Sequence, residues 1–171
     1  MAALVDDNYR SAMPPRFIVD VNVGRLAKWL RAMGYDTLFV PDVDDRDLVR
    51  IAQQQERTIL TRDHLLLERR AVARGQVTAV LVQGDHFHEQ IGQVASALGL
   101  RLDNEFSRCI QCNAELSDLA KEETPDRVPT YVYQTQEEFK ECPTCRRVYW
   151  RGTHWHNMKR EIAKVRESYG A

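Results

Sequence analysis

Short apolar runs alternate with segments of helical periodicity over residues 17–99. The runs are rich in valine, isoleucine, leucine and threonine, a composition typical of buried strands. They occupy residues 17–21, 37–40, 58–61 and 78–82. The pattern therefore predicts a strand at each of these places.

The segments between the runs carry apolar residues three and four positions apart, as one face of a helix does. The first helix is expected over 23–33, where Leu26, Leu30 and Met33 share a face and Gly34 follows as a stop. The others are expected at about 45–56, 65–73 and 87–98. Strand and helix thus alternate repeatedly, which predicts an α/β fold with a mainly parallel sheet flanked by helices on both faces.

The charge pattern changes after this alternating region. Residues 103–126 carry seven acidic and two basic side chains, whereas residues 146–166 carry seven basic and one acidic. We expect a flexible leader at 1–16, an α/β domain at 17–102 and a second module at 103–171. In that module, short strands are expected around each cysteine pair, at 131–133 and at 148–150, with a basic helical tail at about 157–168.

All four cysteines occur in two CxxC pairs, Cys109 with Cys112 and Cys142 with Cys145. A CxxC turn points two sulfurs at one ion, and two such turns complete the tetrahedral set that zinc prefers. We therefore expect one structural zinc ion in a small C-terminal zinc ribbon. The alternatives are two disulfides or a thioredoxin-like redox motif, although a redox motif needs only one CxxC.

Composition narrows the class of protein further. Of 171 residues, 43% are hydrophobic and 29% charged, which allows a globular core. The formal net charge of −1 does not favour a strongly basic nucleic-acid binder, although local patches matter more than the sum. No apolar run approaches the roughly 20 residues of a membrane span, and the first residues lack the apolar core of a secretory signal. We therefore expect a cytoplasmic protein without a membrane partner.

Aspartates stand at the ends of the expected strands. They are Asp20 at the first strand, Asp42, Asp44 and Asp45 after the second, Asp63 after the third and Asp85 after the fourth. Ligands bind beyond the carboxyl ends of strands in an open parallel sheet. Magnesium and manganese favour carboxylate ligands and can activate a water molecule against a phosphate. The acids therefore suggest phosphodiester hydrolysis.

A simpler interpretation of the acids is helix capping, because aspartate is a favoured N-cap and each position precedes a helix. Asp45 is the clearest candidate cap, since it begins a helix-like run. Asp20 fits capping less well, because it ends an apolar run where an unpaired buried carboxylate costs roughly several kcal/mol. A metal ion or a hydrogen-bond network is expected beside it.

Two groups of cations are candidates for contact with a nucleic-acid backbone. Arg25, Lys28 and Arg31 recur along the first helix opposite its apolar face, where a plain solvated surface is the alternative. The second group lies in the basic stretch after the last cysteine pair, interleaved with Trp150 and Trp155, whose rings can stack on bases. Some of those rings must instead cover the core of the ribbon.

Several other catalytic motifs are absent from the sequence. It has no GxGxxG after the first strand, no P-loop and no Gly-x-Ser-x-Gly elbow. A phosphoaspartate receiver also clusters acids at strand ends, but nothing clearly supplies its late-strand lysine. His64, His86 and His88 lie next to the expected acidic pocket, and no catalytic role is assigned to them.

Four stretches of the chain together resemble the Mut-seven C-terminal RNase family. They are FIVDVNVGRLAKWLRAMGYDT, VDDRDLVRIA, RTILTRD and the two cysteine segments C-x2-C-N and CPTCRRVYWRGTHW. They occur in the family's order over about residues 16–160. The resemblance implies a PIN-like nuclease fold with a fused zinc ribbon, and cleavage of single-stranded RNA by acidic residues that bind magnesium or manganese.

Matched motif by motif, the resemblance implies that Asp20, Asp45 and Asp63 bind magnesium or manganese and are catalytic, and Asp44 can share the role of Asp45. Asn22 stands where small or leucine-like residues are expected, so it is a departure from the pattern and a further candidate contact. The residues expected to contact RNA are Arg25, Lys28, Arg31, Arg62, Arg147, Arg151, His154 and Lys159.

The rival interpretation is a non-catalytic RNA-binding or adaptor module that keeps a nuclease-like fold. It takes the acids as helix caps and assigns RNA binding to the basic, aromatic part of the ribbon. It predicts that RNA is bound without regard to magnesium and is recovered intact.

Overall fold

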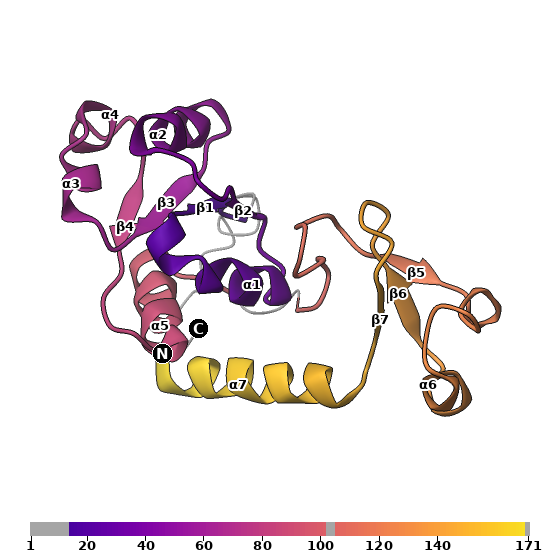
Figure 1. Ribbon diagram of the computed structural model, residues 1–171. Coiled ribbons are helices and arrows are strands. Elements are labelled where there is room, and N and C mark those ends of the chain that lie inside the picture. Colours follow the sequence, from indigo (N-terminus) through magenta and orange to yellow (C-terminus); the bar gives the residue numbers. More distant parts are fainter. Residues whose placement is uncertain (1–13, 102–104, 170–171) are drawn as a thin grey trace, which may run out of the picture.

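The computed structural model describes residues 14–101 and 105–169. Most of the expected leader at 1–16 lies outside the described residues, and so does the expected boundary between 102 and 103. Within the described part, the chain forms a four-stranded sheet with helices and a three-stranded sheet in the ribbon (Figure 1).

The four-stranded sheet is parallel throughout, as its strand pairing shows. Its strands are β1 (Phe17–Val19), β2 (Thr37–Phe39), β3 (Thr58–Thr61) and β4 (Ala79–Leu81). The order across the sheet is β2-β1-β3-β4, so the chain steps to one side of β1 for β2 and to the other side for β3. The expected α/β fold with a parallel sheet is confirmed. All four strands end on the same side, called here the carboxyl end of the sheet (residues 20–24, 40–45, 62–64 and 82–86).

Helices cover both faces of this sheet because side chains of each strand alternate between two cores. Phe17, Val19 and Leu60 belong to one core, and Ile18 and Ile59 belong to the other. The first core is closed by α1 (Arg25–Ala32), α5 (Phe87–Leu98) and α7 (Thr153–Tyr169). The second is closed by α2 (Asp45–Gln54), α3 (His64–Leu67) and α4 (Arg70–Ala73) on the opposite side in Figure 1.

The helices between the strands of the parallel sheet agree with the sequence-based expectations except at one place. The helix expected at 65–73 is divided into α3 and α4 by Arg69, whose backbone is extended (φ −55°, ψ 131°). Gly34 follows α1 at φ 92° and Gly99 caps α5 at φ 60°, both in the left-handed region that glycine adopts without strain. A short 3-10 turn, η2 (Val21–Val23), lies between β1 and α1.

The ribbon is antiparallel and has a small core of its own. Its strands are β5 (Ser117–Leu119), β6 (Phe139–Glu141) and β7 (Val148–Trp150). A 3-10 turn, η3 (Lys121–Glu123), and the helix α6 (Thr130–Thr135) connect β5 to β6. Leu119, Val132 and Phe139 pack together in this core.

Two expectations for the ribbon need correction. The strand expected at 131–133 is part of helix α6, which begins after Pro129 and turns Val132 into the ribbon core with Tyr133 packed against it. Strands β6 and β7 flank the second cysteine pair, but the first pair has a single bridge between Arg108 and Glu115 in place of strands. The strand at 148–150 is confirmed as β7.

Helix α7 carries the chain from the ribbon back to the α/β layers (Figure 1). It is longer than the helix expected at 157–168 and packs against α5. Met158, Ile162 and Val165 are buried in the same core as α1 and α5. The ribbon is therefore inserted in the sequence between α5 and α7, two helices that share one hydrophobic core. None of the helices in the described part combines the length and the apolar character that a membrane span requires.

Candidate functional site

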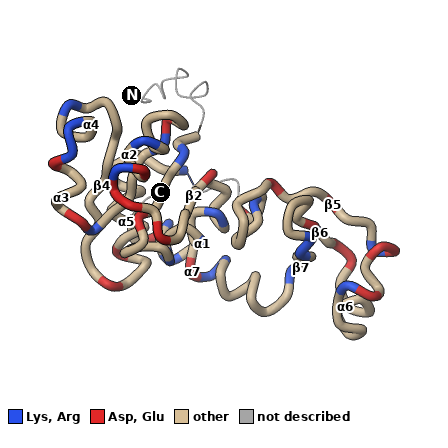
Figure 2. Tube along the Cα trace, turned by 45° about the horizontal axis from the view of Figure 1, so that its top comes forward, with Lys and Arg blue, Asp and Glu red and all other residues tan. Residues whose placement is uncertain are grey.

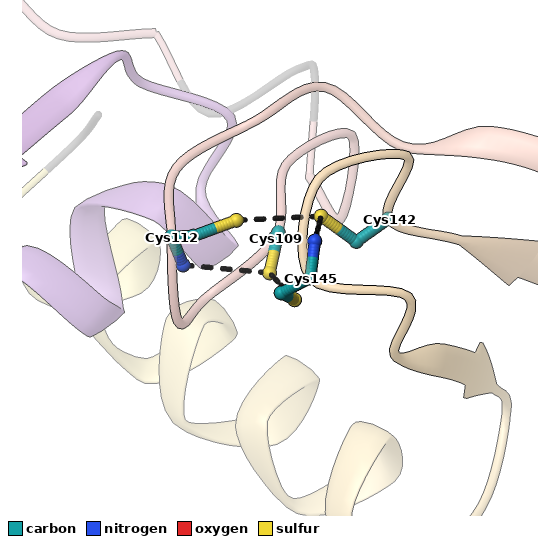
Figure 3. Close-up of side chains that lie close together, drawn as sticks. All are labelled: Cys109, Cys112, Cys142 and Cys145. Atoms are coloured by element: carbon teal, nitrogen blue, oxygen red, sulfur yellow. Dashed lines mark hydrogen bonds between the residues drawn. The ribbon is translucent and has the colours of Figure 1, made fainter.

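The four cysteines converge from two loops, as Figure 3 shows. Their sulfur atoms all lie within 4.8 Å of one another. The Sγ atoms of Cys109 and Cys145 are 3.6 Å apart, and those of Cys112 and Cys142 are 3.3 Å apart. A tetrahedral zinc ion with Zn–S bonds of about 2.3 Å needs sulfurs about 3.8 Å apart, whereas a disulfide needs about 2.05 Å. The arrangement therefore fits one zinc ion, and all four cysteines are free of disulfides.

The two cysteine turns have the same local geometry. In each, the backbone N–H of the second cysteine donates to the sulfur of the first, Cys112 to Cys109 at 3.5 Å and Cys145 to Cys142 at 3.4 Å. A left-handed residue closes each turn, Asn113 at φ 74° and Arg146 at φ 60°. We call residues 109–113 the first cysteine turn and residues 142–146 the second. Their likeness explains how two distant segments present four sulfurs to one point.

Hydrogen bonds around the first cysteine turn favour a thiolate. Burial would raise the pKa of Cys109, but the Tyr149 hydroxyl, 3.0 Å from its sulfur, and the backbone N–H groups of Cys112 and Gln111 outweigh burial and lower that pKa to about 6. A metal-bound sulfur is a thiolate, so these donors suit a zinc ligand.

The first cysteine turn is fastened to the start of β2. The side chain of Asn113 accepts from the backbone N–H of Thr37 at 2.9 Å and donates to Asp36 at 2.7 Å. Arg31, at the end of α1, donates to the backbone oxygens of Ile110 and Gln111 at 3.1 and 2.8 Å. The cysteine cluster is therefore anchored at the amino end of the sheet, opposite the carboxyl end.

Arg31 corrects one expectation about RNA contacts. Its side chain is only 5% exposed, and its third hydrogen bond goes to the backbone oxygen of Thr37 at 2.9 Å. The turn of helix α1 that carries Arg31 faces β2 and the first cysteine turn, so the guanidinium holds these two segments together and does not face solvent. Arg25 and Lys28, on the same helix, are exposed.

Asp20 and Asp63 lie at the carboxyl ends of β1 and β3. Between these two strands the chain leaves in opposite directions, from β1 towards β2 and from β3 towards β4. Asp20 follows β1, Asp63 follows β3, and these two central strands are neighbours. In a sheet of this order, the divergence between β1 and β3 leaves a crevice for ligands at the carboxyl end. Asp20 is 6% exposed and accepts hydrogen bonds from the Thr61 hydroxyl and from the backbone N–H of Val21, both at 2.6 Å. The hydrogen-bond network expected beside Asp20 is present.

Three further acids at this end also have partners within the chain. Asp44, and not Asp45, is the N-cap of α2, accepting from the backbone N–H of Asp47 at 2.8 Å. Asp63 caps α3 through the N–H of Leu65 at 2.8 Å. Asp45 lies in the first turn of α2, where its carboxylate pairs with Arg69 at 2.9 Å. Capping thus accounts for Asp44 and Asp63, and Asp20 also caps the 3-10 turn η2 through the N–H of Val21.

The carboxylates are less tightly gathered than the sulfurs. Over residues 14–101 and 105–169, the four cysteines are the group of three or more potential metal ligands that lies close enough together to hold an ion, and Asp20, Asp45 and Asp63 do not form a second one. Their role as ligands of magnesium or manganese stays a prediction.

Arg62 joins the outer part of the carboxyl end. Its backbone N–H donates to the side chain of Asn22 at 3.2 Å, and its guanidinium pairs with Asp85 at 2.8 Å. Asp85 is therefore occupied by a cation of the chain itself. The sequence pattern singled out neither Thr61 nor Arg69, although the threonine two residues before Asp63 is visible in the segment Thr-Arg-Asp.

The expected RNA contacts of the ribbon and of α7 are at the surface. Arg147, Arg151, His154 and Lys159 are all exposed. Arg151 and Lys159 lie 5.6 and 4.9 Å from the ring centre of Trp155, and Arg151 also pairs with Glu138 at 2.9 Å. Figure 2 shows acidic and basic residues interspersed along the trace, so any attraction for RNA is local.

The histidines beside the sheet differ in their surroundings. His64 and His86 are exposed. The Nε2 atom of His88 lies 2.7 Å from a carboxylate oxygen of Glu161 on α7. His88 therefore belongs to the contact between α5 and α7.

A comparison with protein families gave one match. A family model described as the Mut7-C RNAse domain matches residues 15–162, a range that includes the parallel sheet, the ribbon and the first half of α7. The comparisons with curated proteins and with solved structures gave no match.

Proposed function

The chain belongs to the Mut7-C RNAse domain family, and from this we propose that it is a metal-dependent ribonuclease that cleaves single-stranded RNA. The observation that carries the proposal is the placement of Asp20, a buried carboxylate at the divergence of β1 and β3. A carboxylate there is costly to bury, yet it is held in one orientation by Thr61 and Val21. Such a fixed charge suits a site that binds cations.

In this proposal Asp20, Asp45 and Asp63 hold magnesium or manganese, with Asp44 beside them. Carboxylate oxygens are the ligands that these ions prefer, and the bound ion would supply an activated water and neutralise charge on the phosphate. Asp20 and Asp63 are oriented by hydrogen bonds, whereas Asp45 must leave Arg69 to take part.

Cations near the carboxyl end would bind the RNA backbone. Arg25 begins α1 one residue after η2, and Lys28 follows about one turn later, both exposed. Arg62 contacts Asn22 and Asp85 at the carboxyl end of the sheet. Contacts of this kind are independent of sequence and weaken with salt.

The test is cleavage of a labelled single-stranded RNA by the purified full chain, with manganese added or withheld. Asp20→Asn is the key variant, because asparagine preserves the size of the side chain and can still accept a hydrogen bond. We expect it to reduce metal-dependent cleavage by orders of magnitude while the protein stays folded. Asp126→Asn, the same change at an exposed position in the ribbon, is the matched control. Cleavage by Asp20→Asn at the rate of the unmodified protein would contradict the assignment.

A second candidate function is RNA binding without catalysis. It is favoured by the structural partners of the acids, since Asp44 and Asp63 cap helices and Asp45 pairs with Arg69. In that case the same assay gives bound, intact RNA at every manganese concentration, and Asp20→Asn behaves like the unmodified protein.

A further inference from the structure

A groove of about 890 Å³ lies between the first cysteine turn, α6, β7 and the start of α7. We call it the ribbon groove and define it by six of its residues: Arg127, Tyr131, Arg146, Arg147, Trp150 and His154. It belongs to the ribbon side of the molecule, away from the acids that follow β1 and β3. Its chemistry is therefore separate from that of the proposed catalytic site.

The charge of the ribbon groove is positive. Three arginines line it, and no aspartate or glutamate does. Glu141, below the surface at 16% exposure, orients two of the guanidinium groups, those of Arg127 at 2.8 Å and Arg146 at 3.3 Å. Arg147 is exposed and forms no ion pair with any residue in the described part of the chain. A neighbouring groove of about 550 Å³ differs, because carboxylates such as Asp118 line it together with the cations. Of these two grooves, the ribbon groove is the one whose lining favours an anion.

Aromatic rings give the ribbon groove a second property. Tyr131 is 66% exposed, so its ring is open to a ligand. Trp150 lies over Gly152, where a Cβ atom would be only 2.7 Å from the indole nitrogen, so the glycine leaves room for the ring. Rings beside arginines bind single strands, because every base offers a face for stacking and every nucleotide a phosphate.

From these observations we propose that the ribbon groove binds single-stranded RNA at a second site, remote from the point of cleavage. The proposal rests on the ribonuclease function for the identity of its ligand. Bases stack on Tyr131 and Trp150, and phosphates bind Arg147 and the two arginines held by Glu141. Duplex RNA is excluded from the stacking contacts because its bases are already paired.

The distance between the two sites follows from the fold. The first cysteine turn, one wall of the groove, is fastened to the start of β2 through Asn113 and Thr37. The acids lie at the opposite end of the same sheet. Helix α1 joins the two ends, from Arg25 beside the acids to Arg31 beside the first cysteine turn, and its eight residues span about 12 Å. Exposed Lys28 lies on this path.

A length requirement for the RNA follows from this arrangement. A stacked strand advances about 3.4 Å per nucleotide, so about four nucleotides cover α1 alone. A tetranucleotide therefore occupies one site at a time, whereas a strand of about 20 nucleotides can occupy both. Long strands should bind more tightly, because only they can occupy both sites at once.

The test measures binding of labelled single strands of four and 20 nucleotides to the full chain without added divalent metal. The variants are Tyr131→Ala, which removes a ring, and Arg147→Glu, which reverses a charge. Arg74→Glu, an exposed arginine after α4 near the start of the far edge strand β4, is the matched control. We expect each groove variant to weaken binding of the long strand about tenfold and the control to change it less than about twofold. Binding of the tetranucleotide, which can still occupy the end of α1 beside Arg25 and Lys28, should weaken less than binding of the long strand.

The outcomes separate this proposal from the ribonuclease function. Equal affinity of the variants and the unmodified chain for the long strand would overturn the second site, even if the RNA is cleaved. Equal binding of a duplex of the same length, in competition, would overturn the stacking contacts and indicate a general polyanion surface. Loss of binding in the groove variants, in a chain that cleaves no RNA with manganese, would support the second site and reject the nuclease.

Discussion

The hydroxyl group of Thr61, at the end of β3, donates a hydrogen bond to the carboxylate of Asp20, which follows the neighbouring strand β1. The two oxygen atoms are 2.6 Å apart. The same hydroxyl oxygen accepts from the backbone N–H of Asp63 at 2.9 Å. Thr61 is fully buried, so this one side chain sets the positions of two candidate catalytic acids. The acids are therefore coupled through β3 even though their carboxylates make no direct contact that the structure records.

Thr61→Val tests this coupling, because valine keeps the shape and removes the hydroxyl. It leaves the Asp63 N–H and one oxygen of Asp20 without a partner, and we expect the free energy of unfolding to fall by about 1–3 kcal/mol. Urea unfolding at neutral pH measures the change. Thr61→Ser, which keeps the hydroxyl, should recover most of the loss, and equal stability of the two variants would contradict the role of the hydrogen bonds.

Arg31 and Lys28 form a second test, since they share α1 but differ in surroundings. Arg31→Met removes the donor for three backbone oxygens and should lower the free energy of unfolding by about 2 kcal/mol or more. Lys28→Met, at an exposed position, should change stability by no more than about 0.5 kcal/mol. RNA binding should show the opposite pattern. Lys28→Met should reduce the slope of log affinity against log salt concentration by about 0.7, whereas Arg31→Met should leave that slope unchanged. A reduced slope in folded Arg31→Met would restore Arg31 as an RNA contact.

Zinc content gives a prediction independent of RNA. Protein purified under reducing conditions should contain one zinc ion per chain, bound by the four cysteines. Cys142→Ser should abolish stoichiometric zinc and unfold the ribbon, because small zinc modules take much of their folding free energy from the metal. Thr144→Ser, between the two ligands of the same turn, should keep both. Metal analysis measures the zinc content, and limited proteolysis of the full chain shows whether cleavage within residues 105–152 increases. A folded, reduced chain without zinc would refute the assignment.

Asp36 predicts a pH dependence of stability. Burial would raise its pKa, but hydrogen bonds from Arg57 and Asn113 and the charge of Arg57 lower it from 3.8 to about 2. Because the folded value lies below the unfolded one, Asp36 stabilises the fold fully above about pH 5, and this contribution declines as the pH falls through 3.8 towards 2. Asp36→Asn should cost about 1–3 kcal/mol at pH 6 and progressively less towards pH 3. Urea unfolding of both proteins over this range checks the trend, and a constant difference would contradict it.

The pair of Asp45 with Arg69 predicts a competition with metal. Arg69→Met removes the cation beside Asp45, so the manganese concentration for half-maximal cleavage should fall by about fivefold, equivalent to about 1 kcal/mol. Stability should change little, since the Arg69 side chain is 51% exposed. Arg70→Met, at the next position, is the control. An unchanged requirement for manganese would remove Asp45 from the proposed metal site.

Much of the architecture follows from local patterns in the sequence. Strand β3 coincides with the run at 58–61, and α2 begins at Asp45 as the periodicity predicts. The parallel sheet follows from the alternation of these elements. The cysteine cluster follows from two CxxC turns, because each turn fixes two sulfurs within four residues and needs only one distant partner.

Features that depend on distant neighbours were predicted less well. The segment 131–133 has the composition of a strand, yet Pro129 and the ribbon core select a helix in which Val132 is buried. The role of Arg31 depends on Ile110, 79 residues away, so the helical periodicity of α1 could not reveal it. Periodicity identifies an apolar face, but the turn of a helix beside another segment can bury a polar side chain as well.

For the acids, too, the sequence determines their positions along the chain, whereas the fold determines their partners. Their places after the strands are a property of the chain, and the parallel sheet brings those places to one end. Which acids cap helices, which one pairs with Arg69 and which is buried beside Thr61 depend on contacts between strands and helices that are distant in sequence. Local spacing selects the elements and the residue types that they present, whereas burial and pairing are set by packing, because each side chain takes the partner that the assembled layers place within reach.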